Sequence, residues 1–265
     1  MEKFNKYFII RILVILSIFL FFFSFLLDKF PISSIEVICT LLSPINPSLE
    51  ISPSITSIVF NIKLPEIITA MLVDAALSIA GATFQGIFKN PLVFPDILGV
   101  SAGSGFGACV AILLAAGNWL IQLFAFIFGL LSVFITYLIS KSYKSGEILV
   151  LVLCAALISA FFNDLISGAK FIADPIDKLL QIVYWLMGSL ADVNIDKLLV
   201  IIVPIVIRTI ILLILILILN ILSMGDEEAQ SLGINPKNLR FIIIAATLIT
   251  AAAVSISGII GGLVW

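Results

Sequence analysis

The chain has 265 residues, of which 62% are hydrophobic and 11% are charged, and its mean hydropathy is +1.29. This composition excludes a water-soluble globule, because too little polar surface is present to cover one, and it predicts a polytopic membrane protein. The net charge of −2 excludes a basic nucleic-acid-binding surface, and the absence of histidine excludes an imidazole metal site and a histidine-dependent catalytic group. The cysteines lack CxxC spacing and are expected to be small buried hydrophobic residues, so no metal ligand and no catalytic residue is predicted: Cys39, Cys109 and Cys154.

Apolar windows of about 20 residues, the length that crosses a bilayer as a helix, recur along the chain. Seven are present or begun: 8–27, 62–84, 97–116, 119–139, 148–167, 198–222 and 240 to the end. The first window follows basic residues, as a signal peptide does. It is long, however, and no small-residue cleavage site follows it, so an uncleaved first helix is expected.

The distribution of lysine and arginine predicts a cytoplasmic N-terminus, because basic residues favour the inner loops. In this orientation the inner side carries Lys3, Lys6, Arg11, Lys89, Lys141, Lys144, Lys237 and Arg240. The outer side keeps Lys29, Lys170, Lys178 and Lys197, with Lys63 near the membrane edge. The outer loop 168–197 includes DKLLQIVYWLMGSL, for which we expect a short amphipathic helix at the interface, anchored by Tyr184 and Trp185.

The second span carries a regular polar pattern. Asp74, Ser78, Gly81 and Gln85 are spaced four, three and four residues apart, which places them on one face of a helix. One interpretation is the lining of a water-filled pathway, and the other is a packing seam, because small residues let membrane helices approach closely. The carboxylate favours the pathway, since packing needs no charge.

A break follows the second span. Pro91 and Pro95 each remove a backbone donor and restrict the preceding residue, so a cytoplasmic turn is expected around Asn90 and Pro91. Glycines then recur every four residues, which predicts a ridge for close contact with a neighbouring helix: Gly99, Gly103 and Gly107. No lysine follows these glycines, so the stretch is no phosphate-binding P-loop.

A polar segment, LSMGDEEAQSLGINPKNLR, occupies residues 222–240 on the predicted cytoplasmic side. It has a turn at Gly225, an acidic helix start over 226–228, and a stop at Gly233 before Pro236. A short amphipathic helix at the membrane surface fits this pattern, and an ordinary solvated loop is the alternative.

These motifs, in this order, resemble the FecCD/BtuC family of membrane permeases, which serve ATP-driven importers of iron chelates, haem and cobalamin. The resemblance covers nearly the whole chain. Its residues are Leu64-Pro65, Ala80-Gly81, Gln85, Asn90-Pro91-Leu92, Pro95, Leu98-Gly99-Val100, Ser101-Ala102-Gly103, the WLMGSL segment at 185–190, and GDEEAQSLG at 225–233 with the following AATLITAAAVSISGIIG.

The resemblance implies an all-α bundle of ten helices, of which about seven are present here. Residues 1–265 would form a single transmembrane permease domain, C-terminally incomplete because the chain stops at GIIGGLVW. It also implies a multi-pass protein in the cell membrane of a prokaryote. The expected partners are a second permease copy or paralogue, two ATPase subunits that carry ATP and Mg, and an extracytoplasmic substrate-binding protein. The permease itself would bind no cofactor.

Roles for particular residues follow from the same resemblance. The polar face of the second span would line the substrate pathway, and the inner gate would be the turn Asn90, Pro91 and Leu92. The cytoplasmic coupling segment would be 223–239, with the ATPase contacting Gly225, Asp226, Glu227, Glu228, Ala229, Gln230, Ser231, Leu232 and Gly233. Docking of the binding protein would use Lys63 and Glu66.

The sequence departs from the family pattern at several points. Glu66 stands where the family has a basic residue, so a changed docking preference is expected. Asp74 replaces a small residue, and Arg208 lies in the sixth apolar window. Charges in lipid are costly when unpaired, so we expect these two to pair or to share a water-filled cavity. An ion-coupled secondary transporter and a nonfunctional truncated remnant are the competing interpretations.

Overall fold

The computed structural model describes residues 6–27, 32–43, 52–88, 98–142 and 148–188, the stretch 230–233, and single residues at 90, 96, 195, 198, 202, 206, 207, 210 and 221. Every element in these ranges is a helix, as the composition predicts. The chain divides into two compact units, and each is described by itself. The first is Met1–Met71 with Ala191–Leu198, and the second is Leu72–Leu190 with Leu199–Trp265.

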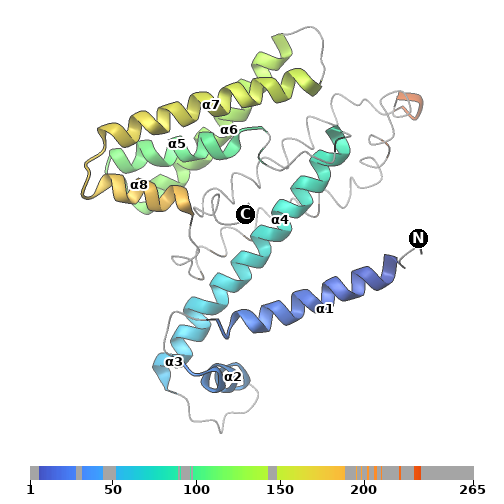
Figure 1. Cartoon of the computed structure of the whole chain (residues 1–265), viewed down its shortest axis with the longest axis vertical. Coiled ribbons are helices and arrows are strands. Elements are labelled where there is room, and N and C mark those ends of the chain that lie inside the picture. The colour runs from blue at the N-terminus through green and yellow to red at the C-terminus, as the bar shows by residue number, and fades with distance from the viewer. Residues whose placement is uncertain are drawn as a thin grey trace. The chain divides into compact units, whose positions relative to one another are not determined.

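The described residues of the first unit form three helices, a π-helical turn and the start of a longer helix (Figure 1). They are α1 (Lys6–Ser24), α2 (Ser34–Leu42), α3 (Pro53–Ser57), η1 (Ile58–Lys63) and the first residues of α4 (Leu64–Phe88). A capping box begins α2, because Ser33 Oγ accepts from the backbone of Ile35 and the Glu36 carboxylate accepts from the backbone of Ser33.

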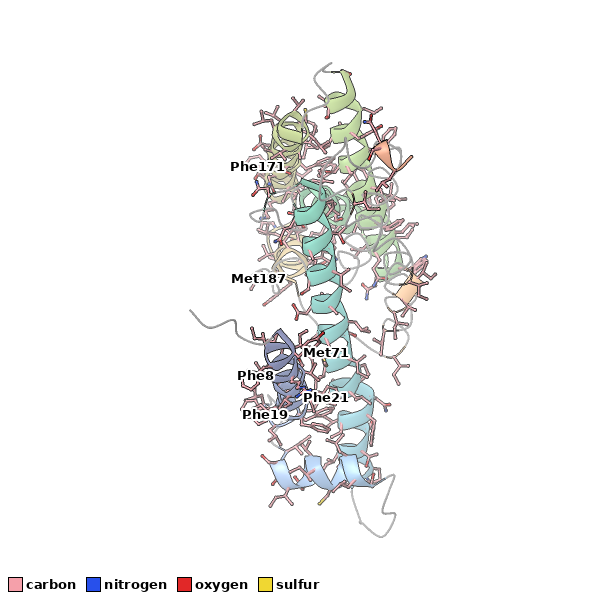
Figure 2. All side chains as sticks on the ribbon, turned by 90° about the vertical axis from the view of Figure 1, so that its right-hand side faces the viewer. Phe8, Phe19, Phe21, Met71, Phe171 and Met187 are labelled. Carbon is pink, nitrogen blue, oxygen red and sulfur yellow. The ribbon has the colours of Figure 1, made fainter. Side chains whose placement is uncertain are left out.

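The core of the first unit lies where α1, α2 and the π turn meet. Its buried residues are Phe25, Val37, Val59 and Ile67. The membrane-spanning part of α1 is otherwise uncovered within the described chain. Figure 2 shows Phe21 of α1 near Met71 of α4, whereas the side chains of Phe8 and Phe19 in α1 are exposed.

A continuous helical segment runs through α3, η1 and α4, from Pro53 to Gly86, and exceeds the predicted window 62–84. Pro53 at the first turn suits a helix start, because its missing N–H has no helical partner there. Pro65 lies inside the segment, where its ring crowds the preceding turn. The backbone widens into a π turn just before it, where Leu64 N–H donates to Val59 O. This wider turn leaves room for the proline ring inside the helix.

In the described part of the second unit, four helices pack side by side after the end of α4 (Figure 1). They are α5 (Val100–Leu113), α6 (Asn118–Ser142), α7 (Ile148–Ile172) and α8 (Lys178–Met187). The 14 residues of α5 extend only about 21 Å at 1.5 Å per residue, which is shorter than a bilayer core. The predicted span 97–116 is therefore shorter in the structure, whereas α6 and α7 are long enough to cross a membrane.

The glycine ridge of α5 makes the predicted close contact. A side-chain Cβ at Gly103 would meet the Phe128 carbonyl of α6, and one at Gly107 would meet the Phe124 carbonyl. Gly99 precedes α5 with φ +78°, a left-handed conformation that glycine adopts without strain, and its carbonyl accepts from Ser132 Oγ at 2.7 Å. The ridge prediction is confirmed.

The predicted spans agree with the described helices at three further places. The helices α1, α6 and α7 coincide with the windows 8–27, 119–139 and 148–167, with shifts of a few residues at their ends. The last two windows, 198–222 and 240 to the end, lie outside the described residues apart from isolated positions.

Candidate functional site

The polar face predicted on α4 is largely open. Asp74, Ser78 and Gln85 are exposed, whereas Gly81, which shares their face of the helix, is buried. Since no described helix covers Asp74 and Ser78, a packing seam against a described helix does not account for them. The pathway interpretation and a packing seam with another part of the protein therefore both stay predictions.

A neighbouring side of α4 holds the helix in the second unit. Val73, Ala80 and Phe84 are buried there. Phe84 packs in a cluster with Leu98, Val100, Val133 and Ala155, which come from the start of α5, from α6 and from α7. The apolar face of α4 therefore fixes which side of the helix remains open.

The turn expected as an inner gate is described at one of its three residues. Asn90 is exposed, and its backbone N–H donates to Gln85 O at 3.2 Å, which closes the end of α4. Pro91 and Leu92 lie outside the described residues. The gate role stays a prediction.

Asp96, which was not predicted as a site residue, holds the start of α5. Its carboxylate accepts from the backbone N–H of Ser101 at 2.8 Å, and its carbonyl accepts from Gly99 N–H at 2.9 Å. Burial raises the pKa of the Asp96 carboxyl, and the bonds from Ser101 oppose that rise. An acidic residue shortly before a helix is a recognised start signal, so this function was detectable in the sequence.

The two residues expected to dock a binding protein differ in their surroundings. Lys63 is only 5% exposed, and its Nζ donates to the Phe25 carbonyl at 2.8 Å, at the C-terminal end of α1. Glu66 lies one turn further along the chain and is half-buried. A cation at a helix C-terminus satisfies free carbonyls and complements the helix dipole. This contact gives Lys63 a structural role, and its docking role stays a prediction.

The amphipathic helix expected in the outer loop is present as α8, but it packs into the bundle. Ile182 is fully buried among residues of α5 and α7, and Trp185 packs against the same cluster. Tyr184 is exposed. Lys178 Nζ donates to Leu113 O at 2.7 Å, so the start of α8 is tied to the end of α5. The apolar face of α8 therefore contacts protein, and the anchoring of Tyr184 and Trp185 at the membrane interface stays a prediction.

The coupling segment 223–239 is described only at its centre. Gln230, Ser231, Leu232 and Gly233 are all exposed. Gly233 has φ +75°, and its N–H donates to Gln230 O at 2.9 Å, which confirms the predicted helix stop at this glycine. The remaining predicted contacts, Gly225 to Ala229, lie outside the described residues, as does Arg208, so its pairing with Asp74 stays a prediction.

A second open polar face lies on α7, and the sequence analysis missed it. Ala156, Ala160, Asn163 and Ser167 follow the same spacing of four, three and four residues as the face of α4, and all four are exposed. Asp164 is exposed beside them. The spacing was readable in the sequence, but its first two members are alanines that look like ordinary apolar residues.

The chain matches known proteins over nearly all of its length. A family model described as the FecCD transport family matches residues 15–264. The molybdate import system permease protein MolB of Haemophilus influenzae is 38% identical over 215 residues, which cover 81% of this chain and 64% of that protein. The "Probable iron chelatin transport system permease protein" of Helicobacter pylori strain 26695 is 37% identical over 209 residues, which cover 78% and 63%.

A solved structure described as an inward-facing conformation of a metal-chelate type ABC transporter shares the fold. Its TM-score is 0.79 at 34% identity, covering 94% of this chain and 76% of that one. The chain spans a little under two thirds of the length of the two curated relatives named above.

Proposed function

Because the chain belongs to the FecCD transport family, we propose that it is the membrane permease subunit of an ATP-binding-cassette importer. Its substrate would be a metal chelate of the iron(III)-siderophore, haem or cobalamin type. The observation that carries the proposal is the family match over residues 15–264, which includes the polar face of α4, the break after it and the coupling segment.

The choice of a chelate rests on the related structure. A relative that is 34% identical is described as of metal-chelate type, whereas the relative that is 38% identical imports molybdate. A bulky chelate needs a wide path with small side chains, and Ser78 and Ala82 on the open side of α4 fit this requirement. Molybdate is the other substrate that the relatives name.

The proposed mechanism is alternating access driven by two separate ATPase subunits. ATP-dependent closure of these subunits would move the coupling segment 223–239, whose exposed turn over 230–233 is available for contact. That movement would bias the packing of α4 to α7 around the pathway. The permease would perform no covalent chemistry, since ATP and Mg are held by the ATPase.

The inner gate is proposed at the break between α4 and α5. The bond from Asn90 N–H to Gln85 O ends α4, and the Asp96 carboxylate holds the start of α5. Movement of either helix end would therefore break a hydrogen bond that holds it.

The proposed assembly contains a second permease, two ATPases and an extracytoplasmic binding protein, in a prokaryotic cell membrane with the N-terminus of the permease inside. On the outer side, Glu66 is half-buried and Lys63 is bonded to Phe25 O. A binding protein that docks here would then present fewer carboxylates to this site than the family pattern implies.

Uptake by proteoliposomes tests the proposal. The full chain is reconstituted with its ATPase and binding protein, and uptake of a radiolabelled iron(III) chelate is compared with that of molybdate. We expect chelate uptake that requires ATP and is insensitive to ionophores. Uptake that persists without ATP and is abolished by ionophores would contradict the proposal.

A further inference from the structure

The short helix α2 lies across the direction of the membrane-spanning helix α1. Its 9 residues extend about 14 Å at 1.5 Å per residue, less than half of a hydrocarbon core of about 30 Å. Figure 1 shows α2 end-on, whereas α1 of the same unit runs across the view, and the turned view of Figure 2 shows α2 lengthwise. Because α1 has the length and composition of a membrane span, α2 therefore runs nearly parallel to the membrane surface.

The depth of α2 follows from its contacts with the end of α1. Val37 of α2 is buried in one cluster with Phe25, which directly follows α1. A small apolar slot of about 180 Å³ also opens between the two helices, where Phe22 of α1 faces Ile38 of α2. The helix α2 therefore lies level with the last turns of the spanning helix, at the edge of the hydrocarbon core.

An apolar face of α2 is left uncovered by the described residues. Ile35 is 72% exposed, Ile38 is 49% exposed and Leu42 is 47% exposed. At about 100° per residue these three side chains lie within about 60° of one another. They lie on the far side of the helix from Val37 and Thr40, which are buried. The helix is therefore apolar on its exposed side as well as in its protein contact.

The charge of α2 lies on a different side. Glu36 is the only charged residue of this helix, and its exposed carboxylate accepts from Ser33 N–H at 2.9 Å. It points about 160° away from Ile38, which lines the slot toward α1. A charged side opposite an apolar side that meets hydrocarbon is the arrangement of a helix lying in the membrane interface.

Lipid suits the exposed face of α2 because this face continues a lipid-facing surface. The slot joins Ile38 to Phe22 and Phe23 of α1, whose side chains are 58% and 41% exposed. An uncovered apolar surface of this kind marks a contact with a membrane or with another protein. The three exposed side chains of α2 carry no charge and no hydrogen-bonding group that would select a protein partner, so the membrane is the better match.

We infer that α2 is an interfacial helix that inserts Ile35, Ile38 and Leu42 into the leaflet at the C-terminal end of α1, which is the outer leaflet in the predicted orientation. Its binding partner is the lipid surface itself, and the slot admits part of an acyl chain. Since Val37 packs with Val59 of the π turn, α2 holds the end of the first unit at a fixed depth in the membrane. This anchoring goes beyond the proposed transport function and requires neither substrate nor ATPase.

Spin-label accessibility in proteoliposomes tests the contact with lipid. The full chain, with its three native cysteines replaced by alanine, carries a nitroxide at Ile35→Cys. The lipid reference is Ile15→Cys in the middle of α1, and the water reference is Ile176→Cys in the loop before α8, both at exposed positions. The ratio of oxygen to nickel-chelate accessibility at Ile35→Cys should exceed that at Ile176→Cys at least about tenfold, because a polar solute enters hydrocarbon only at a cost.

The other outcomes of this measurement each overturn the inference. A ratio equal to that at Ile176→Cys would place the face in water. Low accessibility to both oxygen and the nickel chelate would show that protein covers it. Elution of each labelled variant from a size-exclusion column at the position of the unmodified protein shows that the label has not disturbed the fold.

A second pair of labels tests the orientation of α2. Ile35 and Leu42 lie on the same side of the helix and are about 10 Å apart along its axis. In a helix parallel to the membrane surface the two positions have the same depth, so Ile35→Cys and Leu42→Cys should give equal accessibility ratios. In an upright helix one position would lie about 10 Å deeper than the other. Unequal ratios would overturn the interfacial placement.

Discussion

Two lysines each stabilise the end of a helix that is distant from the lysine in the sequence. Lys63 bonds the carbonyl of Phe25, 38 residues earlier, and Lys178 bonds that of Leu113, 65 residues earlier. Each carbonyl lies at the C-terminal end of a helix, where a cation also complements the helix dipole. Both lysines fall on the predicted outer side, where basic residues are otherwise few, so their presence there has a structural reason.

Replacing Lys63 separates its structural role from docking. Lys63→Met leaves the Phe25 carbonyl without its charged donor in a buried place, and we expect a loss of about 1.5–3 kcal/mol in the free energy of unfolding. Thermal unfolding in detergent measures this loss, and Lys170→Met, in the last turn of α7, is the control. If Lys63→Met left stability unchanged but weakened binding of the substrate-binding protein, docking would be its main role instead.

The burial of Asp96 predicts a pH dependence. Because its pKa is raised in the folded protein, folding favours the protonated carboxyl. The stability it contributes is present at low pH and is lost as the pH rises through the raised pKa. The variant Asp96→Asn keeps an acceptor for Ser101 N–H and cannot ionise.

The free energy of unfolding of Asp96→Asn should therefore increase relative to that of the unmodified protein as the pH is raised from about 4 to about 7. Unfolding at several pH values in one detergent measures the difference. A difference that stays constant over this range would show that the carboxyl is not desolvated in the folded state.

At the scale of helices, the short helix α5 organises the second unit. Its glycines bring α6 into backbone contact on one side. On another side, a Cβ added at Gly105 would lie 3.0 Å from Leu186 in α8 and 3.1 Å from Ile166 in α7. Small residues permit this close packing, which in lipid replaces the hydrophobic effect as the source of helix association.

A methyl group added at one of these contacts should lower the stability of the protein, whereas a methyl group added at an open glycine should not. Gly107→Ala places a Cβ against the Phe124 backbone, which has no side-chain freedom to yield, so we expect a loss of about 1–3 kcal/mol in the free energy of unfolding. Gly168→Ala, on the open face of α7, should be neutral or stabilising by up to about 1 kcal/mol. Similar unfolding temperatures for the two variants would contradict the packing described here.

The sequence predicts elements that depend on local patterns. Hydropathy identifies α1, α6 and α7, and four-residue glycine spacing identifies the contact face of α5, because both signals lie within one helix. The π turn before Pro65 was not predicted, because a proline inside a long helix is accommodated in several ways. The packing of α8 was not predicted either, since an amphipathic pattern does not say whether its apolar face meets lipid or protein.

In the candidate sites too, local patterns predict some features, whereas others depend on tertiary contacts. The open face of α4 was predicted from spacing, except that Gly81 is buried. The capping roles of Lys63 and Lys178 depend on contacts across 38 and 65 residues, which no local pattern encodes. Which residues of a polar face meet water is decided by the neighbouring helices, and therefore by tertiary structure.

In the whole molecule, the proposed transport joins a membrane path in this chain to an energy source on another subunit. The open faces of α4 and α7 supply polar surface inside a membrane protein. The exposed turn 230–233 supplies a contact point outside it, on the predicted cytoplasmic side. We propose that an ATPase subunit binds this turn.

Site-specific crosslinking tests that claim most directly. Gln230→Cys, in the full chain assembled with its ATPase, is treated with a short bifunctional crosslinker, and Ile176→Cys, an exposed residue on the predicted outer side, is the control. We expect a crosslink to the ATPase from Gln230→Cys that changes in yield when ATP is added, and none from Ile176→Cys. No crosslink from Gln230→Cys, or equal crosslinking from both positions, would contradict it.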